Sequence, residues 1–443
     1  MSMRRDDLGL RSETVRRANL SAIARELHAC GRISRSELGT RTGLSRSAIR
    51  ALISEFVAAD LASEERAAPL GTPGRPSAVV RPHPESAVVL ALEIAVDSLA
   101  AAVVGFGGEV LDSIRVDSAR GHLSLEETVQ SLVELSTAVG ALPRARRELL
   151  GVGVAIVGVV RQDDGLVSIV PNLGWRDVPL AQRLAEALNV SAPVAVANEA
   201  DLGALSELRR GAARGHRNVL FISGEVGVGG GIIADGRRLT GAAGYAGEVG
   251  HMPVNRGGVA CRCGSVGCWE TEVGEDALLA RAGRPRGGGR DAVDAVLHEA
   301  ADGSPTALEA LDHIGGWLGF GLAGLVNLLN PELIVLGGLF GRMHPFVADV
   351  VERELDRLAL AAPRGLVRVV PAGLGVDSPL LGAAELAFDP FLADPASRLP
   401  RAVPAEAYGE TMPETPHPEW ATTRGDDRPA VPAGSSRSTT DGR

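Results

Sequence analysis

A histidine and three closely spaced cysteines constrain the fold of this chain more than any other feature. Cys261, Cys263 and Cys268 lie within eight residues, and the first of them comes ten positions after His251. Three thiolates and one imidazole form the closed tetrahedral donor set that a structural zinc ion takes. Buried free thiols or a disulfide are the alternatives, but three thiols cannot all pair with one another. The sequence therefore predicts one structural zinc ion per chain, bound by these four residues.

No stretch of the sequence has the length and continuity of a membrane-spanning helix. The longest apolar runs, at 87–96 and 318–329, are interrupted by Glu93 and Asn327. The first residues also lack the apolar segment of a signal peptide. We therefore expect a protein without membrane contact in the cytoplasm, where cysteine thiols stay reduced and available to a metal ion.

Charge is distributed unevenly along the chain. The whole chain has a formal net charge of −10, yet residues 1–85 contain 14 arginines and 10 acidic residues, a balance of +4. The remaining 358 residues therefore carry a net charge of −14. A basic segment on an acidic body indicates a head that binds nucleic acid, because phosphates attract the basic part.

The pattern of residues 1–65 predicts a helix-turn-helix DNA-binding domain. Apolar residues recur at helical spacing before a second, short helix that Ser36 can cap. Gly43 supplies a sharp turn, and Ser45 can cap the third helix, expected at about 45–56. An ordinary helical hairpin is the alternative. The residues that we expect to contact DNA from this last helix are Ser45, Arg46, Ser47 and Arg50.

The segment 66–86 has the composition of a wing hairpin followed by a linker. Its five prolines and two glycines exclude a helix. Arg75 is placed to reach a phosphate or the minor groove of DNA. We expect this linker to transmit changes in the body of the protein to the DNA-binding head.

From residue 87 the chain alternates between short apolar runs and helical patterns, which predicts an α/β architecture over 87–390. Two hairpin patterns, at 88–106 and 219–235, indicate a duplicated fold of two lobes with a cleft between them. Residues 391–443 lack periodicity and predict a disordered tail. The predicted strands are 88–96, 99–106, 149–160, 194–197, 219–223, 333–336 and 367–370, and the predicted helices are 125–139, 180–188, 202–210 and 307–329.

Several motifs follow one another along this body. They are the strand at 149–160, Pro171–Trp175, Asn198–Asp201, Gly227–Gly231, Glu248 with His251, Cys261–Glu270 and Gly337 with Gly338. Their order resembles the ROK family, whose name joins repressors, open reading frames and kinases. The resemblance spans about residues 87–388 and implies an actin-like, two-lobed fold of the sugar-kinase (RNase H-like) type. The added helix-turn-helix resembles the repressor branch of the family, which includes xylose and N-acetylglucosamine repressors.

The resemblance also implies a sugar site. In sugar kinases of the family, an asparagine, an aspartate, two glutamates and the zinc-bound histidine hold the hexose hydroxyls. Carboxylates suit this role because they accept strong hydrogen bonds from neutral hydroxyls. The histidine can give one ring nitrogen to zinc and the other to the sugar, so loss of the metal should damage the pocket. The matching positions in this chain are Asn198, Glu199, Glu248, His251 and Glu270.

Three departures from the family pattern count against kinase activity. The first phosphate loop of the kinases reads Asp-x-Gly-Gly-Thr, whereas Glu93–Asp97 contains neither glycine nor the threonine. The second reads Gly-Thr-Gly, whereas Glu225–Gly227 places a carboxylate near the ATP phosphates. Like charges 4 Å apart repel by about 4 kcal/mol at an effective dielectric constant near 20. Glu199 replaces the catalytic aspartate, so we expect a sugar-binding protein that is not an enzyme and has no catalytic residue.

Together these observations predict a sugar-responsive transcriptional regulator, a repressor of genes for carbohydrate uptake or catabolism. Its effector is expected to be a sugar or sugar phosphate. A homodimer or homotetramer formed through the body would pair two heads on an inverted-repeat operator. One alternative is an ATP-dependent hexose kinase, similar to a glucokinase, with an accessory DNA-binding head. Another is a regulator that acts only through protein partners.

Overall fold

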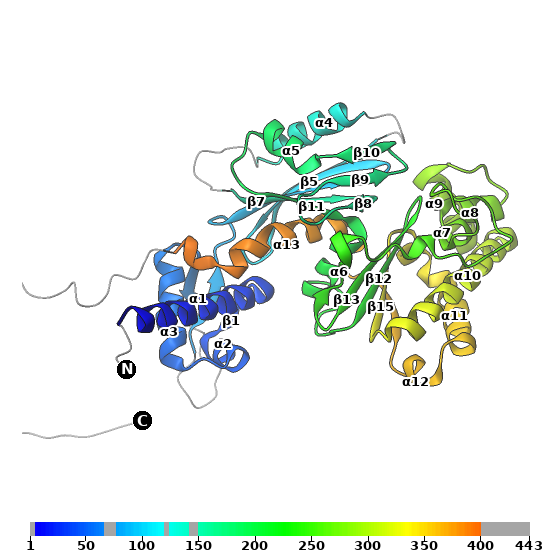
Figure 1. Cartoon of the computed structure of the whole chain (residues 1–443). Coiled ribbons are helices and arrows are strands. Elements are labelled where there is room, and N and C mark those ends of the chain that lie inside the picture. The colour runs from blue at the N-terminus through cyan, green and yellow to red at the C-terminus, as the bar shows by residue number, and fades with distance from the viewer. Residues whose placement is uncertain (1–4, 66–76, 119–123, 141–148, 400–443) are drawn as a thin grey trace, which may run out of the picture. The chain divides into compact units, whose positions relative to one another are not determined.

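The structure is a computed structural model of the 443-residue chain. It describes residues 5–65, 77–118, 124–140 and 149–399 (Figure 1). These residues belong to one compact unit. No helix among them combines the length and the apolar character needed to cross a bilayer.

The N-terminal part forms a small helical head with a three-stranded antiparallel sheet, in the order β1-β3-β2. The second and third helices form the expected helix-turn-helix, and the sheet strands flank the expected wing. Residues 66–76, which include Arg75 and where most of the wing was expected, lie outside the described residues. The elements are α1 (Arg5–Cys30), β1 (Ile33–Ser34), α2 (Arg35–Thr42), α3 (Arg46–Ala58), β2 (Ala62–Glu65) and β3 (Val79–Pro82).

Local capping explains where the helices of the head begin and end. The Ser45 hydroxyl accepts a hydrogen bond from the backbone of Ala48 and caps α3, as predicted. Gly43 ends α2 with a φ of 71°, a conformation that glycine adopts without steric cost. The prediction that Ser36 caps α2 is wrong. Ser34 does so instead, because α2 begins at residue 35 and Ser36 already lies within its first turn.

The first lobe of the body is a five-stranded sheet in the order β11-β7-β4-β5-β6. Strands β4, β5 and β6 form an antiparallel meander, while β7 and β11 add in parallel. Helices α4 and α5 lie on one face of this sheet (Figure 1). The elements are β4 (Val88–Ile94), β5 (Ser98–Gly105), β6 (Val110–Asp117), α4 (Leu125–Ala138), β7 (Leu149–Ile156), β8 (Val159–Val160), β9 (Val167–Val170), β10 (Trp175–Val178), α5 (Leu180–Leu188) and β11 (Val194–Asn198).

The second lobe repeats this topology. Its sheet has the order β14-β13-β12-β15-β16, with an antiparallel meander β12-β13-β14 and parallel strands β15 and β16. The repeat confirms the predicted duplication. The elements are α6 (Glu199–Arg209), β12 (Val219–Gly224), β13 (Val228–Ala234), β14 (Arg237–Arg238), α7 (Trp269–Val273), α8 (Glu275–Arg281), α9 (Gly289–Ala301), α10 (Pro305–Leu329), β15 (Leu333–Gly337), α11 (Gly338–Leu358), α12 (Ala361–Arg364) and β16 (Arg368–Pro371). The last helix, α13 (Ser378–Ala393), returns to the first lobe and packs against its sheet.

The chain beyond residue 390 is where the structure corrects the sequence analysis most. A disordered tail was expected from 391, but α13 continues to Ala393 and ordered structure is described as far as Leu399. Phe391, Leu392 and Leu399 are buried in a core that they share with the helices of the head. Composition cannot reveal such contacts between distant segments. Residues 400–443 lie outside the described part of the chain.

Candidate functional site

The three cysteines and the histidine come together at the surface of the second lobe. His251 belongs to a 3₁₀ turn over Val249–His251, and Cys268 directly precedes α7. Between them the chain folds back on itself through Gly264 and Gly267, which have φ angles of 96° and 69°. A Cβ atom on Gly267 would lie 1.6 Å from the Asn255 carbonyl oxygen, so this close approach requires glycine.

The side chains of this cluster face one another. Their ligand atoms all lie within 4.8 Å of one another. The sulfur atoms of Cys263 and Cys268 are 3.7 Å apart, and the sulfur of Cys261 lies 3.8 Å from Nδ1 of His251. These distances are those of four donors that can surround one metal ion. The structure therefore brings together all four residues that the sequence predicted as metal ligands.

Two glutamates connect the cluster to a cavity. Oε1 of Glu270 lies 2.8 Å from the Cys261 sulfur and 3.6 Å from Nδ1 of His251. On the other side of the ring, Nε2 of His251 is 3.9 Å from Oε2 of Glu248. The histidine therefore presents Nδ1 to the cysteines and Nε2 to the cavity side. A metal bound to Nδ1 would fix the orientation of this ring and, through it, the wall of the cavity.

The cavity has a volume of about 470 Å³ and lies between the two lobes. This size suits a small organic ligand. Carboxylates dominate its polar lining, and hydroxyl-rich ligands match such acceptors. All five residues that the resemblance implied for sugar binding line it: Asn198, Glu199, Glu248, His251 and Glu270.

Asn198 has a structural task in addition to its place in the cavity wall. Its side-chain oxygen accepts hydrogen bonds from the backbone of Ala200, at 2.8 Å, and Asp201, which caps α6. Its side-chain nitrogen donates to the carbonyl of Gly158, at 2.9 Å. Both halves of the amide are thus engaged within the chain. Asn198 holds the first turn of α6, and with it Glu199, at a fixed place in the cavity.

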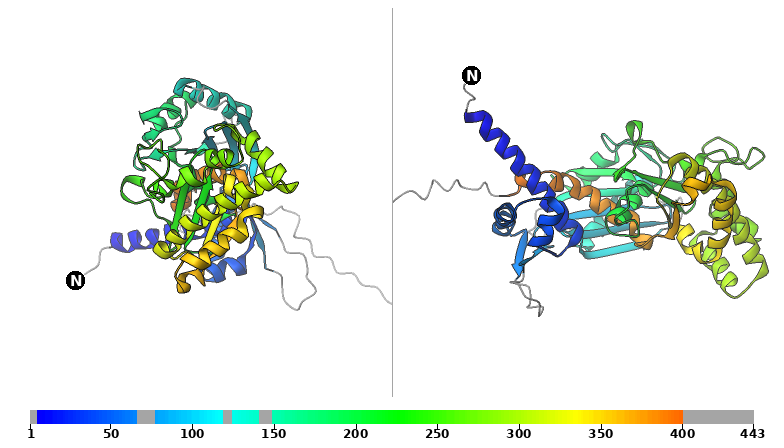
Figure 2. Two further views of the ribbon diagram at one scale, coloured as in Figure 1. Left: turned by 90° about the vertical axis from the view of Figure 1, so that its right-hand side faces the viewer. Right: turned by 90° about the horizontal axis from the view of Figure 1, so that it is seen from below.

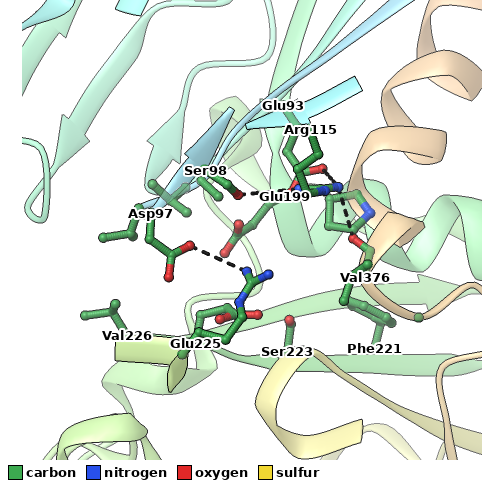
Figure 3. A pocket seen from close by; sticks show the side chains of 17 residues that line it. Glu93, Asp97, Ser98, Arg115, Glu199, Phe221, Ser223, Glu225, Val226 and Val376 are labelled. Carbon is green, nitrogen blue, oxygen red and sulfur yellow. Dashed lines mark hydrogen bonds and ion pairs between the residues drawn. The ribbon is translucent and has the colours of Figure 1, made fainter. Parts of the chain in front are cut away.

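A second, smaller cavity adjoins the first, and Glu199 lines both. Figure 3 shows the side chains of Glu93, Asp97, Glu199 and Glu225 gathered around it. They come from β4, from the turn after it, from the start of α6 and from the loop after β12. The two segments that match the phosphate loops of the kinases therefore both contribute carboxylates to the smaller cavity.

Arginines balance part of this negative charge. Arg115 on β6 donates to both carboxylate oxygens of Glu93, at 3.2 and 2.9 Å. Arg290 on α9 lies 3.6 Å from Asp97 and so connects the two lobes. Neither arginine was predicted from the sequence, because neither belongs to a motif. The only sequence signal was the buried charge of Glu93, which requires a partner when it lies in a sheet.

Burial raises the pKa of three of these acids, Glu93, Glu199 and Glu225. Burial, with Glu225 and Glu93 adding to it, raises the pKa of the Glu199 carboxyl to about 8. Burial, with Asp97 adding to it, raises the pKa of Glu225 to about 7. At neutral pH the carboxyls of Glu199 and Glu225 carry protons for part of the time, so they can donate as well as accept hydrogen bonds. The site can therefore both donate hydrogen bonds to neutral hydroxyl groups and accept hydrogen bonds from them.

Because the pKa of Glu199 is raised, we predict that Glu199→Gln increases the thermal stability of the protein, and that the increase depends on pH. In the wild type, the stability associated with this carboxyl is fully present below its ordinary pKa of 4.5 and is lost as pH rises through about 8. The amide stays neutral throughout. We expect the melting temperature of the ligand-free variant to exceed that of the wild type by several degrees at pH 9 and by less than about 1 °C at pH 5. An equal difference at both pH values would contradict this assignment, and Glu309→Gln, at an exposed position on α10, is the control.

The candidate DNA-contacting residues lie together on one exposed face. Ser45, Arg46, Ser47 and Arg50 are all exposed at the start of α3. The opposite face of α3 is buried through Ile49, Leu52, Ile53 and Phe56. Arg75 falls outside the described residues, so its predicted role stays a prediction.

Comparison with known proteins identifies the family. The sequence profile of the ROK family matches residues 89–389, more than half of the chain. The chain belongs to the ROK family. The actin-like sugar-kinase fold expected from the motifs is thereby confirmed. A crystal structure of a ROK family transcriptional regulator, a homologue of the E. coli MLC protein, has the same fold, with a TM-score of 0.71 at 24% identity over 87% of this chain and 98% of that one.

Relatives of two kinds match the chain. The xylose repressor of Bacillus subtilis (strain 168) is 28% identical over 380 residues, which cover 85% of this chain and 97% of the repressor. The glucokinase of Streptomyces coelicolor is 30% identical over 320 residues, which cover 68% of this chain and 98% of the kinase. The repressor match covers more residues than 89–443 contain, so it extends to residues before position 89.

Proposed function

We propose that this protein is a DNA-binding transcriptional repressor whose activity responds to a sugar. One observation carries the proposal. A helix-turn-helix head with an exposed polar face is attached to a sugar-kinase body in which four carboxylates surround the position expected for nucleotide phosphates. Similarity to a xylose repressor along 85% of the chain supports this function over that of a kinase. A cytoplasmic location follows from it.

The head would bind DNA through the N-terminal part of α3. In helix-turn-helix proteins the second helix of the motif enters the major groove and its first residues contact bases. Arg46 and Arg50 are the candidates for base contacts, while Ser45 and Ser47 are candidates for phosphate contacts. Two heads of a homodimer or homotetramer would then contact an inverted-repeat operator.

Arg50→Ala tests this assignment. If Arg50 contacts a base, the variant should lose about 1–3 kcal/mol of binding energy on the operator and far less on random DNA. Binding titrations on both DNAs at several salt concentrations measure this difference. Glu55→Ala is not a suitable control because Glu55 pairs with Arg16, whereas Val57→Ala changes an exposed residue at the far end of α3. An equal loss on both DNAs would make Arg50 a phosphate contact instead.

Zinc is the metal ion that best fits the cysteine and histidine cluster. A tetrahedral zinc ion with Zn–S bonds of about 2.3 Å holds its sulfur ligands about 3.8 Å apart. The observed sulfur–sulfur distance of 3.7 Å agrees with this value. When bound, zinc would supply structural order and a fixed histidine ring. The sugar would then lie against Nε2 of His251 and the carboxylates of Glu199, Glu248 and Glu270.

An ATP-dependent hexose kinase is the second candidate, because a glucokinase matches the body at 30% identity. The chemistry of the smaller cavity disfavours it. ATP phosphates would have to lie beside Glu225 and Glu93, where they meet carboxylates in place of the backbone amides of a glycine-rich loop. Glu199 would also have to replace an aspartate whose side chain is one methylene shorter.

We therefore expect no phosphorylation of sugars. A coupled assay of ATP turnover with a panel of hexoses and pentoses should give rates indistinguishable from a blank without enzyme. Turnover that Glu199→Gln abolishes would contradict the proposal and favour the kinase. Thermal shift with the same panel identifies the effector independently, because a ligand that binds only the folded protein raises its melting temperature.

A further inference from the structure

Two helices of the body begin at the cavities and end beneath the DNA-binding head. Helix α6 starts with Glu199, which lines both cavities, and ends at Arg209. Helix α13 starts at Ser378, and Val376 and Pro379 at this end line the smaller cavity. Figures 1 and 2 show the other end of α13, in orange, beside α1 of the head, in blue.

These two helices pack closely against one another. A Cβ atom on Gly382 of α13 would lie 2.0 Å from the carbonyl oxygen of Leu202 on α6. The hydroxyl of Ser206 donates to the carbonyl of Ser378 across the same contact, at 2.7 Å. The fully buried Glu207 accepts from the Ser378 hydroxyl at 2.8 Å. Because close-packed interiors transmit strain, such contacts favour movement of the two helices as one unit.

The head is attached to the far end of this pair through Arg210, the residue after α6. Its Nη2 atom donates to the carbonyl of His28 on α1, at 3.2 Å, and lies 2.7 Å from Nε2 of the same residue. Its Nη1 atom donates to the carbonyl of Gly107 in the turn between β5 and β6, at 3.1 Å. Glu385 of α13 pairs with Arg210 and lies 3.3 Å from Nε2 of His28.

His28, through which Arg210 contacts the head, is buried. His28 is only 2% exposed and lies between the rings of Phe106 and Phe388, whose centroids are 5.8 and 4.5 Å from its own. At the next contact along α13, the Ser21 hydroxyl of α1 donates to the carbonyl of Leu392, at 2.7 Å. The head therefore rests on α13 and Arg210 through buried polar contacts. These contacts connect the head to the body in addition to the linker at 66–86, whose predicted role in transmission stays a prediction.

We propose that the α6–α13 pair carries the state of the sugar cavity to the DNA-binding head and that Arg210 is the positioning residue that couples the two. This inference rests on the proposed function. A sugar that contacts Glu199 acts on the first residue of α6, and the eleven residues of this helix span about 16 Å to Arg210. Coupling then requires only that the pair occupies different positions with and without sugar, and that Arg210 imposes the difference on α1.

The neighbouring Arg209 provides a matched control. It donates to the carbonyl and carboxylate of Glu385, at 3.1 and 2.9 Å, and to Asp389 at 2.6 Å. These partners all lie on α13, so within the described part of the chain the hydrogen bonds and ion pairs of Arg209 stay inside the body. Arg209→Met and Arg210→Met remove the same guanidinium group and keep a similar aliphatic chain. Only the second cuts a contact between body and head.

The experiment measures operator affinity with and without the sugar found in the panel, for the wild type and both variants. Arg210→Met should bind the sugar and the sugar-free operator within about threefold of the wild type, while the change in operator affinity caused by sugar falls at least tenfold. Arg209→Met should keep the wild-type response. A full response in Arg210→Met, or an equal loss in both variants, would overturn the inference and leave the proposed function intact.

Amide hydrogen exchange provides a readout that needs no DNA and no identified sugar. Arg210→Met should increase exchange in residues 20–30 of α1 while the cavity segments stay as protected as in the wild type, and Arg209→Met should not. Unchanged exchange in α1 of Arg210→Met would contradict the inference that Arg210 holds α1 against the body. A wild-type protein that binds no operator or responds to no sugar would instead overturn the proposed function.

Discussion

Cys268→Ser is expected to remove the metal from the protein and to weaken sugar binding at least 100-fold. Cys268 is fully buried and directly precedes α7, the helix that carries Glu270. The loss of one of four ligands releases the loop from His251 to Cys268 and, with it, the ring that orders the cavity wall. The zinc content measured by elemental analysis should fall from one ion per chain to almost none. Calorimetric titration should show the loss of sugar affinity.

The fourth cysteine of the chain serves as the control for this experiment. Cys30 lies at the end of α1, outside the metal cluster. Cys30→Ser should therefore retain both the metal and the sugar affinity. Cys268→Ser protein that still contains one metal ion per chain would show that the cluster is not the metal site. Metal loss with undiminished sugar affinity would show that the metal does not order the cavity.

Glu248→Ala should abolish the sugar response and leave the metal and the DNA affinity in place. Glu248 lines the larger cavity and lies 3.9 Å from the cavity-side nitrogen of His251. Hydrogen bonds from sugar hydroxyls to a carboxylate contribute about 1.5–3 kcal/mol each, so the loss of this group should weaken binding about 10- to 100-fold. At a sugar concentration that only just saturates the wild type, the variant therefore stays mostly unliganded, and its operator affinity stays close to the sugar-free value.

Operator titrations at a sugar concentration that saturates the wild type measure this effect. Glu309→Ala, at an exposed position on α10, should respond as the wild type does. A Glu248→Ala protein that contains metal and still responds fully would place the sugar elsewhere. A variant that loses operator affinity without sugar would show that Glu248 also affects the head.

The repeating elements of the fold could be predicted because their signals are local. Each of the seven predicted strands is present in the structure, and the hairpins at 88–106 and 219–235 belong to the repeated antiparallel meanders of the two sheets. Strand β6 was missed because most of its residues are exposed and it contains no continuous apolar run. Amphipathic edge strands of this kind resemble surface loops in a single sequence.

The metal cluster was predictable for a similar reason, since its ligands fall within eighteen residues of one another. The cavity residues came from the family resemblance, and the structure places all five around one cavity. What the sequence could not reveal are contacts between distant segments. Arg290 and Asp97 are separated by nearly half the chain, and His28 meets Arg210 across 182 residues. Such pairs produce no periodicity or motif in the sequence.

The most direct test of the account is a titration of the wild-type protein on its operator, selected from random DNA, in the presence and absence of the sugar found by thermal shift. The account predicts specific operator binding that falls steeply with salt and changes at least tenfold when the sugar is added, with no ATP required. The same titration with ATP in place of the sugar should leave the affinity unchanged. Operator affinity that does not depend on any sugar, or that changes only with ATP, would contradict it.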